Sequence, residues 1–442
     1  MADKQLETTT AASAFQKQWF ADLRRRVFDE RQPYALLQAD VPFELFDLLE
    51  IPAVSNQWWA SIIAAKRQAP QFLGAMDADG LHGGLCRYCS LGFASTRYAY
   101  AGEPPWGGLP TPRLLCARLT CDCIHRVFEL WAEAFGAELF EIDHPGAGEL
   151  PERWWELGRH QWRELVEPHR LAFMVATLES LVERLEAISG RAFDRNALRD
   201  RLELVNQQEE VFDEARRLIA SAPECPVRMT EQITNVMATQ WVRGGEWALS
   251  HARAFRDEVK QRVDAGIAAC PDERARLMWV GAGLWHDTGF YTAFESSHRA
   301  VFVWSMYLAF GPDGYIRYGL DDPMAALASR TASFNEYLHN PPWAAEWLVH
   351  QAREHRINGA LVLRPRSMKP AGTGRLFIER ALEAAGIPVL PIEADVVVTE
   401  APAHPGTNGH QRARRLRPTY ERRRRPPRWA VLECLRPRAP AR

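Results

Sequence analysis

Two pairs of cysteines are the strongest chemical signal in this 442-residue sequence. The first pair has the form Cys86-x-x-Cys89, and the second has the form Cys121-x-Cys123. Cysteine thiolates bind zinc and iron–sulfur clusters, and a CxxC pair can also form a redox disulfide. Cysteine is also one of the residue types most often buried without any such role. The spacing fits a four-cysteine zinc site only loosely, so metal binding, redox chemistry and plain burial all stay open.

The elements around the second pair indicate how it is positioned. Residues 113–119 are typical of a buried strand, residues 124–135 have apolar side chains at helical spacing, and residues 139–143 return as a strand. Cys121 and Cys123 lie in the turn between the first strand and the helix. Open α/β sheets bind their ligands at such strand ends. We therefore expect a β-loop-α-β unit that presents these two cysteines.

Strand and helix alternate in two separate parts of the chain, with a helical stretch between them. The pattern predicts an α/β fold with two Rossmann-like lobes, each with a parallel sheet, and a helical insert. We place the boundaries as follows: 1–39, an N-terminal helical arm; 40–150, the first α/β lobe with Cys86 and Cys121; 151–270, a helical region; 271–400, the second α/β lobe with the Met368 loop; and 401–442, a basic tail.

Composition excludes several classes of protein. The chain is 47% apolar and 25% charged, as in ordinary globular proteins, and it contains neither a membrane-length apolar stretch nor a signal-peptide core at its start. We expect a cytoplasmic protein with no membrane partner. The tail has twelve arginines and only two acidic residues, so the rest of the chain is strongly acidic, which argues against nucleic acid as a partner. The tail lacks an apolar period and is expected to be disordered, or non-native if the reading frame shifts near residues 397–402.

Several motifs in combination resemble the 2-hydroxyacyl-CoA dehydratase and benzoyl-CoA reductase family. They are Cys86-Arg87-Tyr88 after a glycine-rich approach, Leu114-Leu115 leading to Thr120-Cys121, the helix with Val127-Phe128-Glu129-Leu130, and RSMKP followed by GIPVLPIEAD. The similarity extends over roughly residues 40–396.

The resemblance implies that three cysteines hold a [4Fe–4S] cluster with one iron open to the substrate. Cys86 and Cys121 match the first two positions, and Cys89 is available as a substitute. The third position falls on Met368, whose neutral thioether is a much weaker ligand than a thiolate. Another thiolate could complete the cluster, the cluster could be labile, or this subunit could have lost it.

The resemblance also implies an enzyme subunit that transfers low-potential electrons to an acyl-CoA thioester. We expect a benzoyl-CoA reductase-like dearomatisation, because of the Cys86-x-Tyr88 form, the 35-residue interval from Cys86 to Cys121 and the 16 tryptophans. The alternatives are a 2-hydroxyacyl-CoA dehydratase subunit, which removes water by a radical route, and a structural partner subunit without a cluster. The implied partners are a homologous second subunit and an ATP-dependent activator protein, because the sequence has no P-loop of its own.

Other polar residues have types and positions suited to a substrate site. Ser55 and Asn56 follow a predicted strand and could contact the substrate, although an ordinary turn role is the alternative. His286 follows another strand and could deliver a proton, although a solvated turn is the commoner role for such a residue. Three basic residues could bind the phosphates of CoA, although basic loop residues are usually only solvated: Arg364, Arg366 and Lys369.

Overall fold

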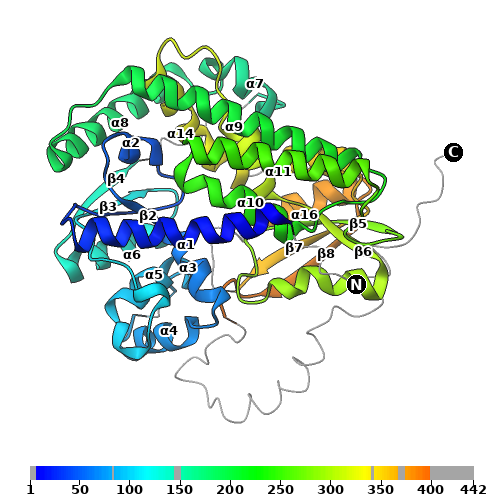
Figure 1. Ribbon diagram of the computed structural model, residues 1–442, viewed down its shortest axis with the longest axis horizontal. Coiled ribbons are helices and arrows are strands. Elements are labelled where there is room, and N and C mark those ends of the chain that lie inside the picture. The colour runs from blue at the N-terminus through cyan, green and yellow to red at the C-terminus, as the bar shows by residue number, and fades with distance from the viewer. Residues whose placement is uncertain (1–5, 82–83, 144–150, 340–342, 367–373, 399–442) are drawn as a thin grey trace.

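The computed structural model describes residues 6–81, 84–143, 151–339, 343–366 and 374–398 (Figure 1). Within them the strands form two parallel sheets of four strands each. The first sheet has the order β2-β1-β3-β4 and comprises β1 (Ala35–Leu37), β2 (Ala53–Ser55), β3 (Leu114–Arg118) and β4 (Glu138–Ile142). The second has the order β6-β5-β7-β8 and comprises β5 (Ala275–Val280), β6 (Ala300–Ser305), β7 (Gly359–Pro365) and β8 (Val389–Ala394). The predicted α/β fold with two parallel-sheet lobes is confirmed.

Helices cover both sheets and fill the space between them. Those of the first lobe are α2 (Phe43–Leu48), α3 (Asn56–Ala65), α4 (Ala69–Ala78), α5 (Arg87–Arg97) and α6 (Asp122–Phe135). The middle of the chain forms α7 (Trp154–His160), α8 (Pro168–Ser189), α9 (Arg195–Ser221), α10 (Met229–Thr239) and α11 (Glu246–Asp264). The rest are α12 (Ala293–His298), α13 (Phe310–Gly314), α14 (Pro323–His339), α15 (Trp343–Glu354) and α16 (Arg375–Ala384).

The central strands are apolar because both of their faces are covered. Every residue of β3, β5 and β6 is buried, which is the pattern of a parallel sheet with helices on both sides. In each sheet the second strand in the chain pairs on one side of the first strand, and the third strand pairs on its other side. The strand order therefore reverses between β1 and β3 and between β5 and β7, and such switch points are where α/β sheets bind ligands.

The N-terminal arm is a single long helix, α1 (Glu7–Phe28), which runs between α10 of the helical region and α3 of the first lobe (Figure 1). Its Phe15 stacks on Trp247 of α11 with ring centroids 3.4 Å apart, and Gln16 accepts a hydrogen bond from Trp58 Nε1 at 2.8 Å. The arm therefore contacts both the first lobe and the helical region. None of the described helices is both long and apolar enough to cross a membrane. The basic tail and Met368 lie outside the described residues.

Candidate functional site

A cavity of about 900 Å³ lies where the carboxyl ends of the two sheets face each other. Residues that directly follow strands line it: 38–40 after β1, 120–122 after β3, 281–283 after β5, and 306–307 after β6. Both switch points therefore open into the same space. Six tryptophans also line this space: Trp58, Trp106, Trp241, Trp279, Trp285 and Trp347. An aromatic lining of this kind suits a ligand with a large apolar part.

One side of the cavity carries the thiols, and we call it the thiol wall: Cys86, Tyr88, Cys89 and Cys121. Cys86 immediately precedes α5 and is 1% exposed. Cys121 caps α6 by accepting a hydrogen bond from the backbone N–H of Ile124 at 3.3 Å. Two helix N-termini therefore present cysteines to one space, although these residues are 35 positions apart in the sequence.

The thiols influence one another's protonation. A hydrogen bond from the Cys89 thiol lowers the pKa of Cys86, although burial acts in the opposite direction. The same hydrogen bond raises the pKa of Cys89, and burial raises it further. Burial also raises the pKa of Cys121 to about 11. Cys86 is therefore the thiol of this wall that loses its proton most readily, and the thiolate is the form that reacts or binds a metal.

The described thiols do not by themselves complete a metal site. In the part of the chain that the structure describes, no group of three or more His, Cys, Asp or Glu side chains is arranged to hold a metal ion. Cys123 packs behind the wall, where its sulfur accepts a hydrogen bond from the Cys86 backbone N–H at 3.2 Å. The sequence position implied for a third ligand, Met368, lies outside the described residues. A three-thiolate site is therefore not formed by the described donor set.

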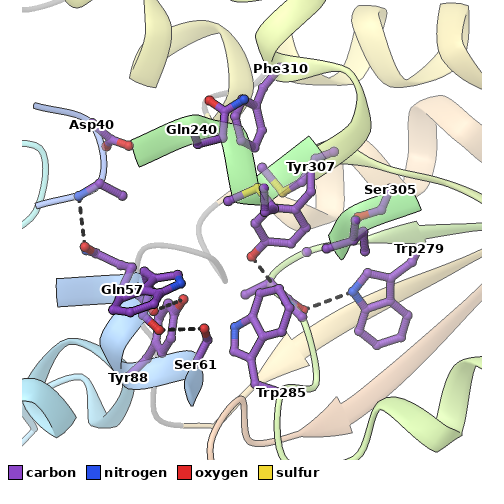
Figure 2. A pocket seen from close by; sticks show the side chains of 18 of the residues that line it. Asp40, Gln57, Ser61, Tyr88, Gln240, Trp279, Trp285, Ser305, Tyr307 and Phe310 are labelled. Carbon is purple, nitrogen blue, oxygen red and sulfur yellow. Dashed lines mark hydrogen bonds between the residues drawn. The ribbon is translucent and has the colours of Figure 1, made fainter. Parts of the chain in front are cut away.

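The opposite side of the cavity carries neutral hydrogen-bonding groups, and we call it the donor wall: Gln240, Trp285, Ser305 and Tyr307. Ser305 ends β6, Tyr307 follows it in a 3₁₀ turn (Met306–Leu308), and Trp285 lies in the loop after β5. Gln240 begins another 3₁₀ turn (Gln240–Val242) directly after α10. Figure 2 shows these side chains around the cavity, with Tyr88 and Gln57 on the side of the first lobe.

Ser55 and Asn56, which were predicted to contact the substrate, are both buried beside the thiol wall. Ser55 caps α3 by accepting a hydrogen bond from the Trp58 N–H at 3.4 Å. Asn56 donates through Nδ2 to the carbonyl oxygen of Cys89 at 2.8 Å. Neither is among the described residues that line the cavity. Asn56 therefore touches the backbone that carries a thiol rather than the open space in front of it.

The other predicted site residues lie near the second sheet. His286 is half-buried and makes a contact of 3.2 Å between its Nδ1 and the carbonyl oxygen of Val396. Its neighbour Trp285 lines the cavity, whereas His286 is not among the described lining residues. Arg364 is paired with Glu379 at 2.8 Å, and Arg366 lies 3.7 Å from Glu393. Lys369 lies outside the described residues. The roles of these residues stay predictions.

Sequence reasoning did not identify the donor wall. Ser305 and Tyr307 directly follow a strand that the sequence analysis treats as buried, so strand-end position was a signal that could have found them. Gln240 has no comparable signal, because its segment continues an amphipathic helix and only the packing of α10 brings it to the cavity.

Comparisons with known proteins place these observations in a family. The model of the 2-hydroxyglutaryl-CoA dehydratase D-component family matches residues 38–407. The chain is 20% identical over 371 residues to an (R)-2-hydroxyisocaproyl-CoA dehydratase alpha subunit from Clostridioides difficile, covering 83% of this chain and 85% of the relative. It is also 20% identical over 364 residues to an (R)-phenyllactyl-CoA dehydratase alpha subunit from Clostridium sporogenes, covering 81% and 82%. These matches favour the dehydratase alternative over the benzoyl-CoA reductase expectation, which has no specific support among them.

Proposed function

The chain belongs to the 2-hydroxyglutaryl-CoA dehydratase D-component family, and on this premise we propose that it is the subunit of an enzyme that removes water from a 2-hydroxyacyl-CoA thioester. The observation that carries the proposal is the shared cavity. Its volume lies at the upper end of the range for small-molecule sites, roughly 300–1,000 Å³. It combines an aromatic lining with thiols on one side and neutral donors on the other.

The residues of the cavity suit the parts of such a substrate. The aromatic lining excludes water from the acyl chain, and the donor wall can hydrogen-bond its oxygens. Our candidates for the CoA phosphates are Arg364, Arg366 and Lys369, and our candidate for moving a proton is His286, next to Trp285 at the cavity. Ser55 and Asn56 are proposed to act on the substrate through the helices and the thiol wall that they support.

An iron–sulfur cluster is part of the proposal, with Cys86 and Cys121 as ligands and Cys89 as a further thiol, although the described donors do not by themselves form a three-thiolate site. Such a cluster would pass on a low-potential electron and would offer an iron that can meet a substrate oxygen. The names of the relatives as alpha subunits support a second, homologous subunit as a partner. We propose an ATP-dependent activator protein as the source of the electron.

The test is anaerobic purification of the chain together with its companion subunit and activator, followed by assay with 2-hydroxyacyl-CoA thioesters. We expect formation of the 2-enoyl-CoA product and bound iron. The Cys86→Ala variant is expected to lose iron and to lose activity by more than ~100-fold, which exceeds the usual effect of a residue behind a metal ligand. Cys270→Ala is the matched control, because Cys270 is not among the described residues that line the cavity.

Two outcomes would contradict the proposal. An iron-free complex that is inactive with every 2-hydroxyacyl-CoA would favour the structural partner subunit without a cluster. Reduction of benzoyl-CoA without any dehydration would restore the reductase interpretation.

A further inference from the structure

Among the buried polar atoms of the cavity lining, those without a hydrogen-bond partner are donors rather than acceptors. Among the described residues, four side-chain atoms both belong to cavity-lining residues and are buried without a hydrogen-bond partner: Gln240 Nε2, Trp241 Nε1, Trp285 Nε1 and Ser305 Oγ. The three nitrogens can only donate, and the serine hydroxyl can donate as well. No acceptor-only atom of a described lining residue is in the same state. The unpartnered buried side-chain atoms of the described lining are therefore all able to donate a hydrogen bond.

This imbalance has an energetic meaning. A buried donor left without an acceptor costs about 1–3 kcal/mol, and buried polar groups in native proteins are almost always satisfied. Gln240 is 1% exposed and Ser305 is 0% exposed, so bulk solvent does not satisfy them. Gln240 is close enough to the buried carboxyl of Glu209 to act on it through a hydrogen bond. The acceptor for Ser305 must then come from what occupies the cavity, either ordered water or a ligand rich in acceptor oxygens.

Tyr307 adds a further donor at the same place. Its oxygen accepts a hydrogen bond from the backbone N–H of Gly283 at 3.3 Å, which leaves its own proton for the cavity (Figure 2). Burial raises the pKa of Tyr307 to about 12, so the phenol remains a donor at neutral pH. Its ring lies 5.3 Å from that of Trp285, centroid to centroid, and Ser305 is two residues away at the end of β6. Tyr307, Trp285 and Ser305 thus form one group.

Trp285 faces the thiol wall from this group. Its indole N–H lies close enough to the Tyr88 oxygen to oppose, as a hydrogen-bond donor, the rise that burial causes in the pKa of that phenol. Its Nε1 nevertheless has no hydrogen-bond partner of acceptable geometry among the described residues. Tyr88 already donates to the carbonyl oxygen of Gln57 at 3.0 Å. A ligand oxygen bound by Trp285 would therefore lie between the donor wall and the helix that begins after Cys86.

The charge of the donors indicates which kind of ligand oxygen they can bind. All of them are neutral. Three cationic residues line the cavity: Arg243 is engaged by Glu44 at 3.1 Å, Arg375 lies 4.0 Å from Glu379, and Lys17 lies on α1 rather than on the donor wall. Carboxylates and phosphates are usually bound by cationic side chains that are available for pairing, whereas a carbonyl oxygen needs only neutral donors. A thioester carbonyl has this character, and donors fixed around it also stabilise negative charge that develops on its oxygen.

We propose that Trp285, Ser305 and Tyr307 bind the thioester carbonyl oxygen of the acyl-CoA and thereby select thioesters over analogues that lack this oxygen. The inference rests on the proposed function, and it adds the residues that determine specificity.

The test compares two ligands of the assembled enzyme: a 2-hydroxyacyl-CoA thioester, and the matching CoA thioether in which a methylene group replaces the carbonyl. Isothermal titration calorimetry measures both affinities. The wild type is expected to prefer the thioester by at least ~10-fold, since a tenfold ratio corresponds to about 1.4 kcal/mol. Tyr307→Phe is expected to weaken thioester binding by ~5-fold to 10-fold and to leave thioether binding unchanged. Ser305→Ala provides the same test if the first variant folds poorly.

The matched control is Tyr318→Phe, which removes a phenol that donates to Glu210 away from the described cavity lining. It should retain the full preference for the thioester. Equal affinity of the wild type for both ligands, or an equal loss for both in Tyr307→Phe, would overturn the inference while leaving acyl-CoA binding intact. If the wild type binds neither ligand, the proposed function fails, and the inference fails with it.

Discussion

The two walls of the cavity differ in how the fold produces them. The thiol wall presents cysteines at the N-termini of α5 and α6, where backbone N–H groups point at the sulfurs. The donor wall presents neutral side chains from the carboxyl end of the second sheet and from the turn after α10. The first wall can stabilise thiolates, whereas the second can only hydrogen-bond an acceptor. We infer that reactivity and recognition come from different lobes, so the cavity functions only while the lobes keep their relative position.

The largest expected effect concerns a buried ionic cluster that fixes this position. Glu44 of α2 pairs with Arg243, directly behind the donor-wall turn, and with Arg330 of α14 at 2.7 Å. Burial alone would raise the pKa of Glu44, but the two arginines outweigh it and hold that pKa well below its usual range. Glu44→Gln should lower the free energy of unfolding by ~3–5 kcal/mol, because two buried cations lose their partner. Urea denaturation measures the change.

Glu50→Gln is the control for this prediction. Glu50 pairs with Arg191, and both side chains are more than half exposed, so its loss should cost no more than about 1 kcal/mol. Similar losses of stability in the two variants would show that the buried cluster does not hold the lobes together.

The next effect is a dependence of stability on pH that is caused by a buried carboxyl group behind the donor wall. Glu209 of α9 is fully buried against Gly311 of α13, and one of its oxygens accepts a hydrogen bond from Gln208 at 2.9 Å. Burial raises the pKa of Glu209 to about 7. The folded state therefore holds this proton more tightly than the unfolded state, whose pKa is about 4.3. The resulting stability is present below about pH 4.3 and is lost as pH rises towards 7, by up to ~3 kcal/mol.

Glu209→Gln should remove this slope. We expect the difference in unfolding free energy between variant and wild type to grow in favour of the variant from pH 4.5 to 7.5, as measured by denaturation at each pH. The control is Glu214→Gln on the exposed face of α9, whose unfolding free energy should change with pH in the same way as that of the wild type. A constant difference for Glu209→Gln across this range would mean that Glu209 is ionised in the folded protein throughout.

The sequence predicted the architecture well because its evidence is local. Apolar strand segments and helical apolar periods directly specify buried elements, and parallel strands follow from their alternation. The convergence of Cys86 and Cys121 on one space was also predicted, although only through the resemblance to a known family. The sequence could not predict that Ser55 and Asn56 would form hydrogen bonds within the fold rather than face the cavity. Polar residues at a strand end look alike whether they cap a helix or face a ligand.

The donor wall was beyond prediction for a different reason. Gln240 reaches the cavity only through the packing of α10, which depends on contacts with α1 and α11 that are distant in the sequence. The preference for an aromatic-ring reductase was drawn in part from the tryptophan content. Trp59 and Trp131 are fully buried and are not among the described cavity-lining residues, so the number of tryptophans carries little information about the substrate.

The smallest expected effect tests how tightly the thiol wall is packed. Gly92 lies inside α5, and a Cβ atom there would stand 2.0 Å from Asn56 Oδ1 and 3.0 Å from Trp131 Cη2. Alanine normally favours a helix over glycine by about 1 kcal/mol, but this contact forces Asn56 or the helix to move. We expect Gly92→Ala to lower the unfolding free energy by ~1–3 kcal/mol, the usual cost of overpacking. Chemical denaturation measures it.

Gly74→Ala supplies the matched comparison, because Gly74 lies inside α4 and its added Cβ would meet nothing within 4 Å. This variant should gain about 0.5–1 kcal/mol, so the two substitutions are expected to have opposite signs. Movement of Asn56 would also release the carbonyl of Cys89, so Gly92→Ala should change the rate at which the Cys86 and Cys89 thiols react with a thiol reagent. If both alanines stabilise the protein and the thiol rates do not change, the thiol wall has room to adjust and is not as tightly packed as these distances indicate.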